Sequence, residues 1–133
     1  MVTMAAERDF PAAQPNPETE AYWKAAAEGR LLLRRGASGR PHFYPRAICP
    51  FDMSDTEWFE ASGRGTIYSY SVMRRASPVY AIGYVTLEEG VSMLTNFVDC
   101  DLDALRIGMD VRVVFKLAGE GRLACFTPVA RPA

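Results

Sequence analysis

The chain has 133 residues, of which 49% are hydrophobic and 23% are charged, and its formal net charge at pH 7 is −1. This size and composition predict one globular domain with at most a small appendage, and the charge gives no general attraction to nucleic acid or anionic membranes. No apolar run approaches the ~20 residues that a membrane-spanning helix needs. The first ten residues carry Glu7 and Asp9 and lack the apolar core of a secretory signal. We therefore expect a cytoplasmic protein.

The N-terminal part predicts an arm followed by a short helix. Residues 1–14 show no hydrophobic period, which indicates a flexible or loosely docked arm. Asn16 can cap a helix that starts just after it, and Gly29 is placed to end that helix. Tyr22 and Trp23 are adjacent aromatic residues on this short, alanine-rich helix, so they need a surface to cover. That surface is either the protein's own ribbon or barrel, or a partner or acyl chain.

The next segment, residues 30–61, has the layout of a two-knuckle zinc ribbon. Residues 31–35 and 41–45 predict a hairpin over a glycine-containing turn. In such a ribbon each knuckle supplies two thiolates to one tetrahedral zinc ion. The four ligand positions are occupied here by Arg35, Ser38, Cys49 and Asp52. Because arginine cannot bind zinc and serine is a poor ligand, we expect these to be vestigial positions without bound metal.

Other interactions must then hold the hairpin. We expect an ion pair between Arg35 and Asp52 in place of two metal ligands. We also expect apolar packing from five side chains: Leu31, Leu33, Phe43, Ile48 and Phe51.

The remaining residues, 62–133, predict a five- to six-stranded barrel of the OB type. A short strand at 56–61 leads into it, and period-two alternation marks a long strand at 66–75. Further strands are expected at 79–87, 91–98, 110–117 and 123–129, with one helical turn at 99–108 capped by Asp101. Simple alternation places four residues of the long strand on one face: Ile67, Ser69, Ser71 and Met73.

The sequence contains no clear catalytic motif. The cysteines Cys49, Cys100 and Cys125 are widely spaced, which favours reduced, mostly buried thiols. His42, the sole histidine, lies seven residues before Cys49, a separation common by chance, so we do not expect a Cys–His nucleophile. No paired-carboxylate, Ser-His-Asp or phosphate-loop pattern is present. We therefore expect that the chain alone is not an enzyme.

The order and spacing of four segments resemble the zinc-ribbon plus OB-fold family of acyl-CoA-associated proteins. The segments are the short helix, the ribbon at 34–52, the strand start at 63–70, and the stretch 101–115. The resemblance spans about residues 17–128 and does not extend to the zinc ligands. It implies a mainly β fold with a short N-terminal helix, a rubredoxin-like ribbon hairpin and a C-terminal barrel. The corresponding division is 1–29 for arm and helix, 30–61 for the ribbon and 62–133 for the barrel.

The ribbon is also the most basic region, with five arginines between Arg30 and Arg46. Guanidinium groups suit the phosphates of a CoA ester, and aromatic faces suit its adenine. The candidate CoA contacts are therefore Arg34, Arg40, Phe43 and Arg46. The alternative is a solvated hairpin whose arginines form salt bridges with Glu18, Glu28, Asp52 and Asp55.

The family resemblance implies a non-catalytic accessory or scaffold subunit. It would bind a thiolase-superfamily, aldolase or hydratase enzyme and help to form its CoA or acyl site. One alternative is a stand-alone acyl-CoA-binding protein. The other is a single-stranded nucleic-acid-binding OB module that uses barrel tyrosines as a stacking platform, namely Tyr68, Tyr70, Tyr80 and Tyr84. Nucleic acid is disfavoured because the barrel has only one adjacent basic pair, Arg74 and Arg75.

Overall fold

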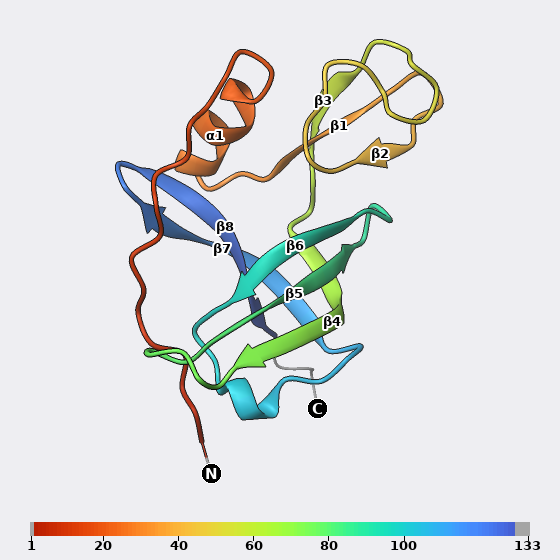
Figure 1. The fold of residues 1–133 in the computed structure, drawn as a ribbon. Coiled ribbons are helices and arrows are strands. Elements are labelled where there is room, and N and C mark those ends of the chain that lie inside the picture. The colour runs from red at the N-terminus through yellow and green to blue at the C-terminus, as the bar shows by residue number, and fades with distance from the viewer. Residues whose placement is uncertain (1, 130–133) are drawn as a thin grey trace.

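The computed structural model describes residues 2–129 and has the predicted fold class. A short helix α1 (Glu20–Ala27) and a three-stranded ribbon sheet lie at one end of a closed five-stranded barrel (Figure 1). The ribbon sheet has the order β2-β1-β3, from β1 (Leu32–Arg35), β2 (Pro41–His42) and β3 (Glu57–Glu60). The barrel has the order β4-β5-β6-β8-β7, from β4 (Arg64–Met73), β5 (Tyr80–Leu87), β6 (Ser92–Phe97), β7 (Asp110–Ala118) and β8 (Gly121–Pro128).

Helix α1 begins later than predicted. Asn16 caps a preceding turn instead, because its side-chain oxygen accepts a hydrogen bond from the Thr19 N–H at 3.0 Å. The helix ends before Gly29, whose φ of 80° is in the left-handed region, as expected for a glycine that terminates a helix. Tyr22 is 3% exposed and faces the protein's own core, and the Trp23 indole N–H donates to the Tyr44 hydroxyl at 2.7 Å. The two aromatic residues therefore cover the protein's own surface.

The N-terminal arm is docked rather than flexible, and Figure 1 shows it running along the barrel up to α1. The Ala5 N–H donates to the Cys100 carbonyl at 2.8 Å. Phe10 is 8% exposed, and the Arg8 guanidinium lies 4.2 Å from the Tyr80 ring centroid. These contacts join the arm to residues far away in the sequence, so the composition of the arm alone does not predict them.

Strand β1 is the centre of the ribbon sheet and pairs antiparallel with both β2 and β3. The segment predicted at 56–61 thus belongs to the ribbon sheet rather than being only a lead-in to the barrel. Leu31 and Leu33 are buried as predicted, but Ile48 and Phe51 are each 45% exposed. The prediction that Ile48 packs inward is therefore wrong, whereas Phe51 packs on the hairpin beside the His42 ring and under the Arg40 guanidinium.

Strand β4 contains a β-bulge. Its register against β5 shifts between Ile67, which pairs with Val85, and Ser69, which pairs with the exposed Tyr84. An extra residue in one strand moves every later side chain to the opposite face. Val72 consequently packs against the core. The prediction from simple alternation is therefore wrong after the bulge. The four residues that it placed on one face do not share a face: Ile67, Ser69, Ser71 and Met73.

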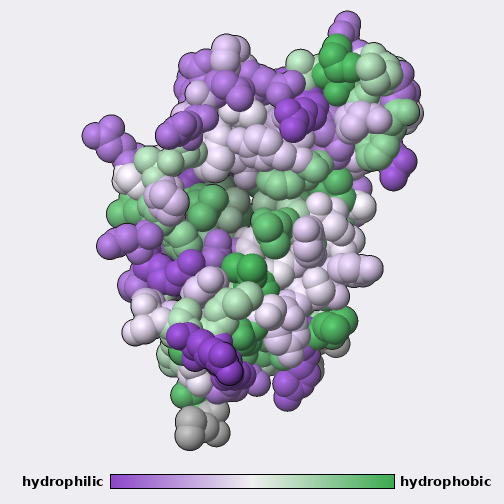
Figure 2. All heavy atoms as spheres, in the orientation of Figure 1, coloured by the Kyte–Doolittle hydropathy of each residue, from purple (hydrophilic) through white to green (hydrophobic). Residues whose placement is uncertain are grey.

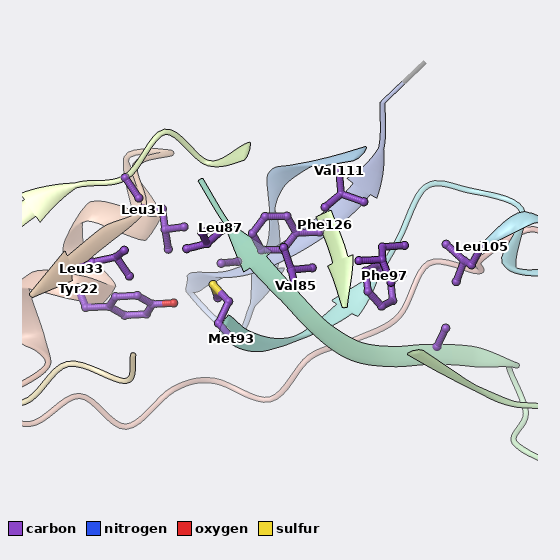
Figure 3. Close-up of a cluster of buried hydrophobic side chains, with 14 of the residues drawn as sticks. Tyr22, Leu31, Leu33, Val85, Leu87, Met93, Phe97, Leu105, Val111 and Phe126 are labelled. Carbon is purple, nitrogen blue, oxygen red and sulfur yellow. The ribbon is translucent and has the colours of Figure 1, made fainter. Parts of the chain in front are cut away.

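The barrel core continues into the ribbon end of the molecule. Figure 3 shows Leu87 and Met93 between Val85 and Phe126 on one side and Leu31 and Tyr22 on the other, and all six belong to one buried cluster. At the other end, the 3-10 helix η1 (Leu102–Ala104) is capped as predicted, because the Asp101 carboxylate accepts from the Asp103 N–H at 3.0 Å. Because the core is shared, α1 and the ribbon are packed against the barrel.

Within residues 2–129, no helix has the length and apolar character needed to cross a membrane.

Candidate functional site

The ribbon sheet brings Arg34 and Arg46 together. Arg34 lies opposite Trp58 on β3, and its guanidinium is 4.4 Å from the Trp58 ring centroid. The same guanidinium donates to the hydroxyl and to the carbonyl oxygen of Thr56, the latter at 2.7 Å. The Thr56 hydroxyl in turn donates to the Arg46 carbonyl at 2.7 Å. Thr56 therefore fixes both arginine-bearing segments in one place.

Glu18 connects this basic region to the segment before α1. Its carboxylate accepts from the Ala47 N–H at 2.8 Å and pairs with the Arg46 guanidinium at 3.3 Å. The Ala47 hydrogen bond is the main cause that lowers the pKa of Glu18, with further contributions from Arg46 and Arg34. Glu18 thus stays ionised and partly offsets the positive charge. The salt bridge from Arg46 to Glu18 that the solvated-hairpin alternative predicts is present.

The other two candidate CoA contacts are Arg40 and Phe43, on either side of β2. Arg40 is exposed at the hairpin turn, and its guanidinium lies 3.6 Å from the Phe51 ring centroid. Among the residues that the structure describes, no carboxylate forms an ion pair with Arg40. Phe43 is half-buried and packs against Tyr22 and Tyr44, with centroid separations of 6.0 and 5.3 Å. Arg34 and Phe43 are thus engaged within the protein and Arg46 is paired with Glu18, which leaves Arg40 as the candidate without a carboxylate partner among the described residues.

The second knuckle is organised by Asp52. Its carboxylate accepts from the Ser54 hydroxyl at 2.5 Å and from the Ser54 N–H at 3.0 Å. The hydrogen bonds from Ser54, led by its hydroxyl, are the main cause that lowers the pKa of Asp52 to about 2. The Ser54 hydroxyl also accepts from the Ala37 N–H of the first knuckle at 2.9 Å. Asp52 and Ser54 together therefore connect the two knuckles through hydrogen bonds.

The predicted ion pair between Arg35 and Asp52 is wrong. The Nε atom of Arg35 lies 3.0 Å from the Glu57 carboxylate instead, and its guanidinium is 4.5 Å from the Phe59 ring centroid. The reason is the pairing of β1 with β3, which places Arg35 directly opposite Glu57. The sequence predicted a strand at 56–61 at the end of the ribbon segment, but not its pairing with the strand at 31–35.

The four ligand positions carry a guanidinium, a hydroxyl, a thiol and a carboxylate, and the Arg35 guanidinium pairs with Glu57. Within residues 2–129, no group of three or more His, Cys, Asp or Glu residues is arranged to hold a metal ion. His42 is buried, and its Nε2 atom accepts from the Arg46 N–H at 3.3 Å. Burial is the main cause that lowers the pKa of His42, which favours the neutral imidazole.

The described cavities lie away from the ribbon arginines. One of about 440 Å³ lies at one end of the barrel between β4, β5 and β7, beside Thr66 and Val111. Another of about 590 Å³ lies between the arm and the β7–β8 turn, beside Trp23. The exposed basic side chains of the ribbon, Arg40 and Arg46, are therefore on an open surface, which a bound molecule would contact from one side only.

Comparison with known proteins identifies both parts of the chain. Residues 23–56 match the family described as "ChsH2, rubredoxin-like zinc ribbon domain", and residues 58–116 match "ChsH2, C-terminal OB-fold domain". A "DUF35 domain-containing scaffold protein" of Methanocaldococcus jannaschii is 37% identical over 108 residues, covering 74% of this chain and 77% of that protein. A protein of the same description from Methanothermobacter thermautotrophicus is 36% identical, covering 62% and 68%.

A longer relative is the "Probable enoyl-CoA hydratase alpha subunit" of Thermomonospora curvata. It is 32% identical, and the match covers 98% of this chain but only 44% of the hydratase subunit. Among solved structures, a chain of the "Ltp2-ChsH2(DUF35) aldolase" superposes with a TM-score of 0.76 at 31% identity, over 87% of this chain and 98% of the other. The ribbon and barrel matches, together with the scaffold relatives, show that the chain belongs to the DUF35 family of zinc-ribbon plus OB-fold proteins.

Proposed function

We propose that the chain is a non-catalytic accessory subunit of an acyl-CoA enzyme of the thiolase, aldolase or hydratase type. Support comes from relatives described as scaffold proteins, as a hydratase alpha subunit and as part of an aldolase. The thiols of the described chain are poor nucleophiles. Burial raises the pKa of Cys100 to about 11 and that of Cys125 to about 12, and Cys49 is fully buried.

The observation that supports a CoA-binding role is the arrangement of arginines on the ribbon. Arg40 is free of ion pairs among the described residues and is exposed on the same ribbon that holds Arg34 and Arg46. Guanidinium groups of this kind bind phosphate oxygens through charge-assisted hydrogen bonds. Because the surface is open, the partner enzyme would complete the CoA site. Phe43 would contribute by supporting the ribbon, since it is half-buried against Tyr22.

Titration calorimetry with acetyl-CoA tests this role on two samples: the complex purified with its enzyme, and the chain alone. We expect the complex to bind and Arg40→Ala to weaken that binding by about tenfold, the loss of one charge-assisted phosphate contact. Arg122→Ala, an exposed arginine on β8, is the matched control and should bind like the wild type. Equal affinity for the chain alone would favour the stand-alone acyl-CoA-binding alternative.

We also propose that the ribbon keeps its shape without zinc. A zinc site of this type needs four ligands such as thiolate or imidazole, and the residues present do not fit that requirement because Arg35 points to Glu57. Ser54 of the second knuckle instead accepts from the Ala37 N–H of the first knuckle and donates to the Asp52 carboxylate. This hydrogen-bond network supplies the connection between knuckles that zinc supplies elsewhere.

A further inference from the structure

The outward side of the β4–β5–β6 sheet carries almost no charge. Strands β5 and β6 contain no Asp, Glu, Lys, Arg or His, and β4 contains only Arg64, its first residue. In Figure 2 the residues over these strands are mainly pale or green, and the strongly hydrophilic residues gather around them. We call the central outward residues the uncharged face: Tyr68, Ser69, Tyr84, Thr86, Ser92 and Leu94.

The uncharged face is continuous across the three strands. Ser69 lies opposite Tyr84, and Tyr84 lies opposite Leu94, so the three form one row across the sheet. The bulge in β4 places Tyr68 next to this row and leaves it 66% exposed. Tyr84 and Leu94 are 46% and 54% exposed. Large aromatic and aliphatic surfaces therefore lie side by side in solvent.

The lack of charge is local to these strands. Strand β7 of the same barrel carries Asp110, Arg112 and Lys116, and β8 carries Arg122. Outward positions of a sheet in contact with water are usually polar or charged. Protein interfaces differ from the rest of the surface in having few charged residues at their centre and an excess of tyrosine. The uncharged face has this composition.

We propose that the uncharged face is the docking surface for the catalytic partner, an inference that rests on the accessory function proposed above. The lack of charge on this face indicates which kind of molecule binds it. Nucleic acid and anionic lipid need cations where this surface has none, whereas a protein surface with an uncharged centre can be buried here without desolvating an ion. The charged groups lie at the ends of the face: the Arg64–Glu88 pair at one end and Arg8, bound to Asn96, at the other.

The uncharged face lies near the ribbon, where the chain and its partner would together form the CoA site. The turn between β5 and β6 contacts the segment that follows β3, because the Glu89 carboxylate accepts from the Ser62 N–H at 2.8 Å. A partner on the uncharged face consequently lies next to the ribbon. Docking there brings the partner's own surface toward the ribbon arginines.

Two substitutions of the same residue type test the proposal. Leu94→Arg places a charge in the uncharged face, and Leu117→Arg places the same charge on β7, where the leucine is 66% exposed. Both side chains are exposed, so thermal unfolding should show that both variants fold. The probe is the enzyme subunit that copurifies with the wild-type chain and is identified by mass spectrometry. Leu94→Arg should weaken its binding by more than about tenfold, and Leu117→Arg by less than about twofold.

A photo-crosslinking experiment in the native host gives an independent readout. Benzoylphenylalanine at position 84 should form an adduct with a thiolase, aldolase or hydratase subunit, and the same group at position 117 should not. Capture of that enzyme from 117 alone, or unchanged binding by Leu94→Arg, overturns the docking face and leaves the accessory function standing. An adduct at 84 with a second copy of the chain or with RNA also overturns it. If no such enzyme copurifies with the wild type, the accessory function itself fails.

Discussion

The Asp52 carboxylate accepts hydrogen bonds from both the hydroxyl and the N–H of Ser54, at 2.5 and 3.0 Å. These bonds lower the pKa of Asp52 from its ordinary 3.8 to about 2. A lowered carboxyl pKa means that the ionised form stabilises the folded state. The contribution is present above the ordinary pKa and is lost as the pH falls through the folded value.

We therefore predict an acid-sensitive ribbon. As the pH falls from about 4 to about 2, the knuckle amides of Phe51, Met53 and Ser54 should lose protection from hydrogen exchange before the barrel strands do. Asp52→Asn should already show weak protection at neutral pH and little further change with acid. Asp55→Asn, an exposed carboxylate on the same loop, is the control. If Asp52→Asn and the wild type respond to acid alike, Asp52 does not organise the knuckle.

The second prediction concerns metal. Protein purified without added zinc should contain well below one zinc atom per chain by plasma mass spectrometry, and EDTA should leave its unfolding temperature unchanged. A four-cysteine ribbon would behave in the opposite way, since zinc binding there supplies folding free energy. The triple variant R35C/S38C/D52C should recover zinc binding through Cys49. Stoichiometric zinc in the wild type would contradict the proposal, and a metal-free triple variant would contradict the ligand alignment.

The third prediction tests the bulged pairing of β4 and β5. A Cβ atom added at Gly83 would overlap the Ser69 carbonyl oxygen and lie 2.7 Å from the Tyr70 Cα atom. Both neighbours are backbone, so they cannot move aside without breaking the strand pair. Gly83→Ala should lower the free energy of unfolding by about 3 kcal/mol, at the upper end for overpacked sites. Gly121→Ala, whose added Cβ has its nearest neighbour at 3.8 Å, should change it by less than about 0.5 kcal/mol.

The fourth prediction concerns the docked arm. Phe10 is 8% exposed and packs beside Val98, Ala118 and Cys125. Phe10→Ala should detach this part of the arm at a cost of about 1.5–3 kcal/mol, the value for exposing one buried aromatic side chain. Limited proteolysis should then cut within residues 2–14 faster than in the wild type. Val2→Ala, at a residue 66% exposed, should leave the rate unchanged. Equal cutting of Phe10→Ala and wild type would mean that the arm is not held by Phe10.

Sequence reasoning predicted the features that depend on local patterns. The order of ribbon and barrel, the termination of α1 at Gly29 and the Asp101 cap of η1 agree with the structure. Each of these follows from a few neighbouring residues, such as an alternation or a capping side chain. The family and the fold class were predicted for the same reason, because the order of such segments is visible in the chain.

Apart from the start of α1, the errors involve contacts between residues far apart in the sequence. Arg35 meets Glu57 rather than Asp52 because β3 pairs with β1, a pairing that no local pattern specifies. The bulge after Ile67 inverts the rest of β4, and a single extra residue is not distinguishable from regular alternation. The candidate CoA residues were chosen by type alone, and long-range contacts engage Arg34 with Thr56 and Arg46 with Glu18.

The measurement that tests the accessory role most directly is purification of the tagged chain from its native host, followed by light scattering and an acyl-CoA activity assay. We predict a stoichiometric complex with a thiolase, aldolase or hydratase subunit, with activity in the complex and none in the chain alone. A chain that elutes alone from the native extract, or one that turns over an acyl-CoA ester without a partner, would contradict the account.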